Sequence, residues 1–117
     1  MNLDDLRPYA LPAAIAAFFA WRFFRFQRVK KRLPELLAQG AVVLDVRSRD
    51  EFASGNSPGS VNIPLQELPG KSLDWDRARP VVVCCASGTR SGMAVGILKG
   101  KGFQKVLNAG PWANTLP

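Results

Sequence analysis

Two adjacent cysteines followed by a glycine and an arginine are the residues best suited to chemistry in this 117-residue chain. They are Cys84, Cys85, Gly88 and Arg90. A cysteine thiolate is a strong nucleophile, and a nearby cation lowers the pKa of the thiol. Glycine allows the backbone a positive φ or a close approach to a ligand, and arginine offers planar paired donors to an oxyanion. The pattern indicates cysteine chemistry on an anionic substrate.

The elements on either side of these residues predict how they are held. The β-branched run from Val81 to Cys84 predicts a buried strand, and the segment from Ser91 to about Lys101 predicts a helix. Backbone N–H groups at the start of a helix, together with the helix dipole, stabilise an anion. We therefore expect Cys85 to be the nucleophile and Arg90 to orient the loop or the donor. The residues expected to bind the anionic substrate are Ala86, Ser87, Gly88, Thr89 and Ser91.

Histidine is absent from the sequence. Its absence excludes Ser/His/Asp catalysis and histidine-ligated metal sites. Without a histidine base, Cys85 must act as a pre-formed thiolate, which suits transfer of a sulfur atom to a soft nucleophile. We predict no metal and no organic cofactor. The adjacent cysteines do not form a secreted disulfide framework, so a reducing compartment is expected.

A second register of the same loop is possible, because Cys84 to Arg90 also reads C-x5-R, as in tyrosine phosphatase loops. Those loops commonly place glycine three residues after the cysteine, and only counting from Cys85 reaches a glycine, Gly88. A phosphatase also needs an acid to protonate the leaving group. Phosphatase or arsenate reductase activity is therefore the lesser alternative. Cys84 itself is interpreted as a core residue, with a resolving thiol as the other interpretation.

Short strands that alternate with short helices predict an α/β fold, with about five parallel strands and helices on both faces. Ser48 is expected to cap a short helix, with Glu51 completing a capping box. Pro34 is expected to open another helix. The predicted domains are residues 1–33, an N-terminal anchor helix, and residues 34–117, the catalytic domain. The strands are expected at residues 41–46, 61–65, 81–84 and 105–108.

The front segment is basic and apolar, since residues 1–33 carry +5 of the formal net charge of +7. The run from Tyr9 to Trp21 is apolar and uncharged, and positive charge follows it. This order favours an uncleaved hydrophobic anchor in the inner membrane, with the catalytic domain facing the cytoplasm and residues 9–32 contacting anionic lipid. The alternatives are a core helix or a helix lying on the membrane surface, with Phe23, Phe26 and Val29 on its apolar face. Nucleic acid binding is not predicted.

After the predicted anchor, three stretches of the sequence follow one another in the order and spacing of a known family. They read VVLDVRSRDEFASGNSPGSVNIPL at 42–65, VVVCCASGTRS at 81–91 and GFQKVLNAG at 102–110. On these stretches, residues 34–117 resemble a rhodanese (thiosulfate sulfurtransferase) domain. In that family the cysteine of C-x-x-G-x-R-S accepts sulfane sulfur, which implies that role for Cys85. The resemblance also implies a structural ion pair between Asp45 and Arg47.

The expected function is sulfur transfer from thiosulfate or a persulfide donor to a thiol or cyanide, through a persulfide on Cys85. The partners are thus a small anionic sulfur donor or a persulfide, and a thiol acceptor. The alternative from another class is a membrane-tethered binding module without turnover. Two positions depart from the family: Asn56 replaces a common histidine, and the neutral Ala86 predicts modest turnover with thiosulfate itself. The sequence does not indicate an oligomeric state.

Overall fold

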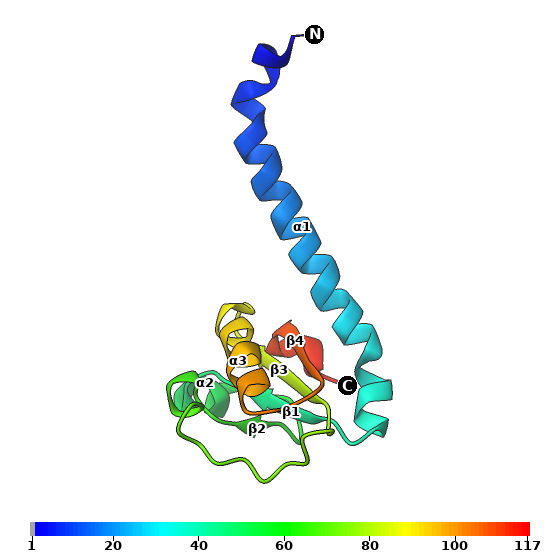
Figure 1. Cartoon of the computed structure of the whole chain (residues 1–117), viewed down its shortest axis with the longest axis vertical. Coiled ribbons are helices and arrows are strands. Elements are labelled where there is room, and N and C mark those ends of the chain that lie inside the picture. The colour runs from blue at the N-terminus through cyan, green and yellow to red at the C-terminus, as the bar shows by residue number, and fades with distance from the viewer. Residues whose placement is uncertain (1) are drawn as a thin grey trace.

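The computed structural model describes residues 2–117 as a small α/β domain from which one long helix projects (Figure 1). Helices and strands alternate along the chain. Their bounds are α1 Leu3–Ala38, β1 Val42–Asp45, α2 Arg49–Ser54, β2 Val61–Asn62, β3 Val81–Cys85, α3 Thr89–Gly100 and β4 Val106–Pro111, with 3-10 turns at Leu65–Glu67 and Trp112–Thr115.

The sheet confirms the predicted parallel α/β class but has four strands, in the order β2-β1-β3-β4, and not five. The connection between β2 and β3 contains Pro69, Gly70 and Pro80 and forms only a 3-10 turn, because these residues do not favour a strand. All strands are parallel, so their carboxyl ends lie at one edge.

Strand β3 is buried on both faces, because α3 covers one face of the sheet and the end of α1 covers the other. Side chains alternate along a strand. Val81, Val83 and Cys85 therefore join the cluster that contains α3, whereas Val82 and Cys84 join the cluster that contains α1. The two adjacent cysteines thus belong to opposite faces of the sheet.

Helix α1 is continuous through Pro34, which corrects the separate helix expected to begin there. Proline inside a helix removes one hydrogen bond. The cost is offset because Leu33 and Leu36 are buried against the sheet and Val29 packs beside them. The helix therefore crosses the boundary predicted between residues 33 and 34.

The apolar front of α1 stands away from the domain and is exposed (Figure 1). Within residues 2–117, no helix is long and apolar enough to span a lipid bilayer, so the predicted spanning anchor is not supported. The helix has the length, but its uncharged run ends at Arg22 and further basic residues follow at short intervals. Two of the three residues predicted on the apolar face of a surface-lying helix, Phe26 and Val29, contact the domain. The predicted lipid contact has no support.

Candidate active site at the carboxyl edge of the sheet

The loop from Cys85 to Arg90 joins the end of β3 to the start of α3, as the sequence predicts. Gly88 is the residue before α3 and has φ 103°, a left-handed conformation that favours glycine. This turn aims the Gly88 N–H at the Cys85 sulfur, with 2.9 Å between N and Sγ. Cys85 is only 1% exposed. The buried thiol is therefore surrounded by backbone N–H donors of the loop and of the start of α3.

The surroundings of Cys85 favour its thiolate. Burial by itself raises the pKa of the Cys85 thiol, because it penalises the charged form. Hydrogen bonds from the Ser91 hydroxyl and from the backbone N–H groups of Ser91, Gly88 and Ser87 outweigh that effect. The pKa of Cys85 is thus lower than that of an ordinary cysteine. A thiol whose pKa is lowered forms the nucleophilic thiolate at lower pH than an ordinary cysteine does.

The Ser91 hydroxyl links the sulfur to Asn108, a residue that the sequence did not single out. Ser91 Oγ lies 3.3 Å from Cys85 Sγ and 2.7 Å from Asn108 Oδ1. A hydroxyl has one proton, so Ser91 donates either to Asn108 or to the sulfur. The neutral thiol donates a hydrogen bond to Ser91 Oγ, whereas a thiolate accepts one from the Ser91 hydroxyl. Asn108 Oδ1 also accepts from the Gly110 N–H at 2.9 Å, so it has a partner whichever way the Ser91 hydroxyl points.

Cys84 has the opposite environment. It is fully buried on the α1 face of the sheet, where burial and the nearby Asp45 carboxylate raise the pKa of Cys84 to about 12. A thiol with this pKa remains protonated at neutral pH. The structure therefore disfavours the phosphatase register, which needs Cys84 as the nucleophile. It supports the interpretation of Cys84 as a core residue.

Arg90 is held by Glu51 at the start of α2, a contact that the sequence did not predict. The two guanidinium Nη atoms donate to the two carboxylate oxygens at 2.7 and 3.0 Å. This pair, with the Ser48 N–H, lowers the pKa of Glu51 to about 2. The capping box of Ser48 and Glu51 is confirmed. Because the paired donors of Arg90 already bind Glu51, this geometry favours its role in orienting the loop.

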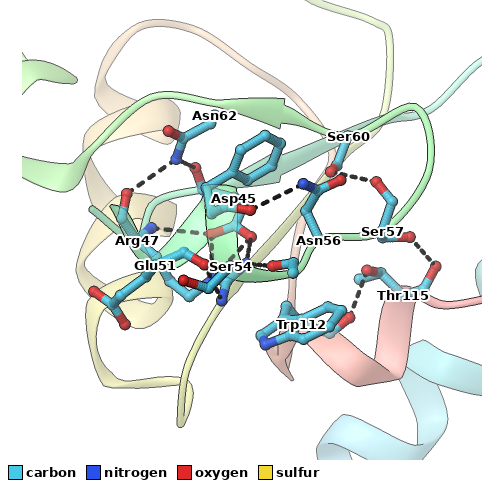
Figure 2. A network of polar contacts seen from close by, with 12 residues as sticks. Asp45, Arg47, Glu51, Ser54, Asn56, Ser57, Ser60, Asn62, Trp112 and Thr115 are labelled. Atoms are coloured by element: carbon cyan, nitrogen blue, oxygen red, sulfur yellow. Dashed lines mark hydrogen bonds and ion pairs between the residues drawn. The ribbon is translucent and has the colours of Figure 1, made fainter. Parts of the chain in front are cut away.

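Asp45 and Arg47 form a buried ion pair beside the loop, with 2.8 Å between Arg47 Nη2 and Asp45 Oδ2 (Figure 2). Arg47 also donates to the carbonyls of Gly55 and Glu51, and its guanidinium stacks over Trp112. The remaining donors and acceptors of this buried pair are therefore satisfied, which such a pair requires. The network fastens β1 to the segment after α2.

Asn56, which replaces the common family histidine, belongs to the same region (Figure 2). Its side-chain amide donates to the Phe52 carbonyl at 2.9 Å, near the end of α2. The neighbouring Ser57 hydroxyl donates to the Thr115 carbonyl at 2.8 Å. These bonds hold the turn against the C-terminal segment. Asn56 therefore has a local structural contact in place of a titrating group.

Helix α1 also reaches the loop. Arg22 Nη2 donates to the Ser87 carbonyl at 3.0 Å and lies 3.2 Å from Thr89 Oγ1, and the Phe26 ring covers Gly88. Beside this contact is a cavity of about 430 Å³ between α1, α3 and β4. Sequence reasoning placed Arg22 and Phe26 on a membrane segment. A stripe at helical spacing could have revealed them: Arg22, Phe26, Val29, Leu33 and Leu36.

Comparison with known proteins agrees with this geometry. The family model described as "Rhodanese-like domain" matches residues 29–110. The chain is 33% identical over 96 residues to the thiosulfate sulfurtransferase GlpE of Pseudomonas syringae, covering 74% of this chain and 91% of that protein. It is 38% identical over 69 residues to YrkF of Bacillus subtilis, provisionally named a sulfur carrier protein, covering 59% of this chain but only 37% of that protein.

Among solved structures, the human single-domain sulfurtransferase TSTD1 superposes with a TM-score of 0.63 at 30% identity, over 72% of this chain and 88% of that one. The parallel sheet, the loop after its central strand and these matches define the class. The chain belongs to the family of rhodanese-like domains. At the level of the family, its relatives are sulfurtransferases.

Proposed function

We propose that the protein transfers sulfane sulfur through a persulfide on Cys85, from thiosulfate or a persulfide donor to a thiol, or to cyanide in the test tube. One observation carries this proposal: the Cys85 sulfur is hydrogen-bonded by the Gly88 N–H at 2.9 Å and by the start of α3, and its pKa is lowered. The relatives named thiosulfate sulfurtransferase support the same chemistry.

In the first half-reaction the Cys85 thiolate attacks the outer sulfur of thiosulfate. A sulfur–sulfur bond forms on Cys85 as the sulfur–sulfur bond of thiosulfate breaks, and sulfite leaves with the electron pair. No proton transfer is needed, which suits a site without a histidine base. The product is a persulfide anion. The backbone N–H groups that stabilise the thiolate are placed to stabilise this anion too.

In the second half-reaction an acceptor thiolate or cyanide attacks the outer sulfur of the persulfide. The Cys85 thiolate is the leaving group, so its lowered pKa assists its departure. Ala86 is neutral and exposed at the loop, where a basic residue would attract a dianion. We therefore expect a persulfide donor to load Cys85 faster than thiosulfate does.

Intact-protein mass spectrometry tests the proposal. After incubation with thiosulfate or with glutathione persulfide, the wild type should gain about 32 Da, the mass of one sulfur atom, and cyanide should remove the gain. The adduct should persist in Cys84→Ser and disappear in Cys85→Ser. An adduct that depends on Cys84 would contradict the proposal. No adduct with either donor would favour a binding module that uses the same loop without turnover.

A further inference from the structure

Helix α1 contacts the active-site loop at the Ser87–Gly88 peptide, whose N–H donates to the Cys85 sulfur. The Ser87 carbonyl accepts from Arg22, and the next N–H, that of Gly88, donates to Cys85 Sγ. These two groups belong to one planar trans peptide, in which C=O and N–H point in opposite directions. A cation that holds the carbonyl on the outside therefore fixes the direction of the N–H on the inside.

The same contact also strengthens the donor. An arginine that binds a carbonyl polarises the peptide, so the N–H of that peptide becomes a better hydrogen-bond donor. Arg22 bonds to Thr89 Oγ1 as well, so it bridges both sides of Gly88. Within residues 2–117, no carboxylate forms an ion pair with Arg22 that would compete for its charge.

Two glycines form a slot that receives α1 at this point. A Cβ atom placed on Gly88 would lie 2.5 Å from Phe26 Cζ, and one on Gly110 would lie 2.6 Å from Phe26 Cδ2. No side chain fits at such distances, so the ring can pack directly on the backbone of both residues. The Arg22 guanidinium lies 5.4 Å from the centre of the Phe26 ring. The Phe26 ring thus sets where Arg22 stands over the loop.

We propose that Arg22 and Phe26 are positioning residues for the sulfur-carrying loop, which makes α1 a working part of the active site. Arg22 acts on Cys85 through the Ser87–Gly88 peptide, and Phe26 docks the helix in the slot of Gly88 and Gly110. Neither residue touches the reacting sulfur. The inference rests on the proposed function for its effect on sulfur transfer, but its effect on the thiol can be measured without any transfer.

The test compares Arg22→Gln with Arg25→Gln in the full chain. Both variants remove one positive charge from α1, one turn apart on the same helix. Arg25 stacks over Trp21 and, within residues 2–117, makes no hydrogen bond to the loop. The first readout is the pH dependence of Cys85 alkylation by iodoacetamide, and the second is kcat and KM for thiosulfate and cyanide.

In Arg22→Gln the apparent pKa of Cys85 should rise and kcat should fall by about tenfold, the effect of losing one charge-assisted hydrogen bond, with little change in KM. Arg22→Lys should recover part of the loss, since an ammonium restores the charge but bridges the two acceptors less well. Arg25→Gln should stay within about twofold of wild type, because it removes a solvent-screened charge and no hydrogen bond to the loop. Phe26→Leu should resemble Arg22→Gln, with a smaller effect.

Equal pKa values and rates in Arg22→Gln and Arg25→Gln would overturn the proposal. Thermal unfolding of each variant shows whether a loss of activity comes from loss of fold, and Arg22→Lys provides the test if Arg22→Gln unfolds. If wild type never carries sulfur, the proposed function fails. The alkylation profiles would still decide whether Arg22 sets the state of the thiol.

Discussion

Cys84 and Cys85 are neighbours in one strand and are equally hidden from solvent, yet their thiols are opposite in character. Cys84 is 0% exposed and Cys85 is 1% exposed, and burial raises the pKa of both. Only Cys85 has hydrogen-bond donors that overcome the effect of burial. Since side chains alternate along a strand, one residue of shift decides whether a sulfur faces the start of α3 or the packed face under α1.

The comparison teaches that burial alone does not decide the reactivity of a thiol. At the face of α1, apolar neighbours and the Asp45 carboxylate oppose the thiolate. At the start of α3, the loop supplies N–H groups in the direction of the sulfur. If β3 were shifted by one residue, Cys84 would face the start of α3 and Cys85 would face α1. The glycine stands at position 88, three residues after Cys85, and its N–H donates to the Cys85 sulfur.

The largest effect should separate the two cysteines directly. Cys85→Ser should lower thiocyanate formation from thiosulfate and cyanide by at least about 10³-fold, since a hydroxyl cannot carry the sulfur. Cys84→Ser should keep activity within a few fold, although it buries a hydroxyl and lowers stability by about 1 to 3 kcal/mol. The colorimetric thiocyanate assay and urea unfolding measure the two effects. Equal losses of activity would remove the distinction.

The Cys84 side depends on the buried ion pair of Asp45 and Arg47. Arg47→Ala leaves the Asp45 charge unpaired and should cost about 3 to 5 kcal/mol in the free energy of unfolding. The same change should raise the pKa of Cys84 further, because Arg47 lowers it. Arg49→Ala is the matched control, because it breaks an exposed ion pair with Glu67 and should cost less than about 1 kcal/mol. Urea unfolding of both variants provides the comparison, and similar costs would contradict it.

On the Cys85 side, the Ser91 hydroxyl is the side-chain donor to the thiolate. Ser91→Ala should raise the pKa of Cys85, so activity at a pH below that pKa should fall by about tenfold and recover as the pH rises. Ser87→Ala is the control, because Ser87 acts on the sulfur through its backbone N–H and keeps it. The pH profile of kcat/KM measures both. A Ser91→Ala profile that superposes on the wild type would show that the hydroxyl does not serve the sulfur.

The smallest effect concerns Glu51 and Arg90. The pKa of Glu51 is about 2, so this pair stays ionised throughout the neutral and mildly acidic range. Glu51 should therefore not titrate in the acidic limb of kcat/KM for thiosulfate, and this limb should report the Cys85 thiol. Glu51→Gln should lower kcat/KM by only about threefold, because the pair is partly exposed, and should not move the limb. A limb displaced along the pH axis in Glu51→Gln would show that Glu51 takes part in the titration.

The sequence predicted the strand, loop and helix around Cys85 because the information for this unit is local. The strand signal at Val81 to Cys84, the turn signal at Gly88 and the helix signal follow one another directly along the chain. Together they predict the whole unit. The partners of the loop lie far along the chain: Glu51 binds Arg90, Asn108 binds Ser91, and Arg22 binds Ser87. Such contacts depend on how the elements pack, which spacing within one element does not reveal.

The front segment shows why composition misled the prediction there. Apolar residues followed by basic ones favour a membrane anchor, and Pro34 favours a helix boundary. The run from Tyr9 to Trp21 stays exposed, and within residues 2–117 no helix is apolar enough over a sufficient length to span a bilayer. Packing prevailed over the Pro34 signal, since Val29, Leu33 and Leu36 hold one continuous helix against the sheet. The same stripe extends to Phe26 and Arg22, so a search for helical spacing across Pro34 would have connected α1 with the active site. The expected count of about five strands exceeded the four strand segments that the sequence analysis assigned, and the sheet consists of those four.

The most direct test of the account is the pH dependence of alkylation at each cysteine of the wild type. The protein is labelled with iodoacetamide from pH 5 to pH 10 and analysed by tandem mass spectrometry. Fragment ions from backbone cleavage between Cys84 and Cys85 show which cysteine carries the label. The account predicts that Cys85 is labelled first, with an apparent pKa below that of an ordinary cysteine, and that Cys84 remains unlabelled over the whole range. Labelling of Cys84 at lower pH than Cys85 would contradict the assignment of Cys85 as the sulfur carrier.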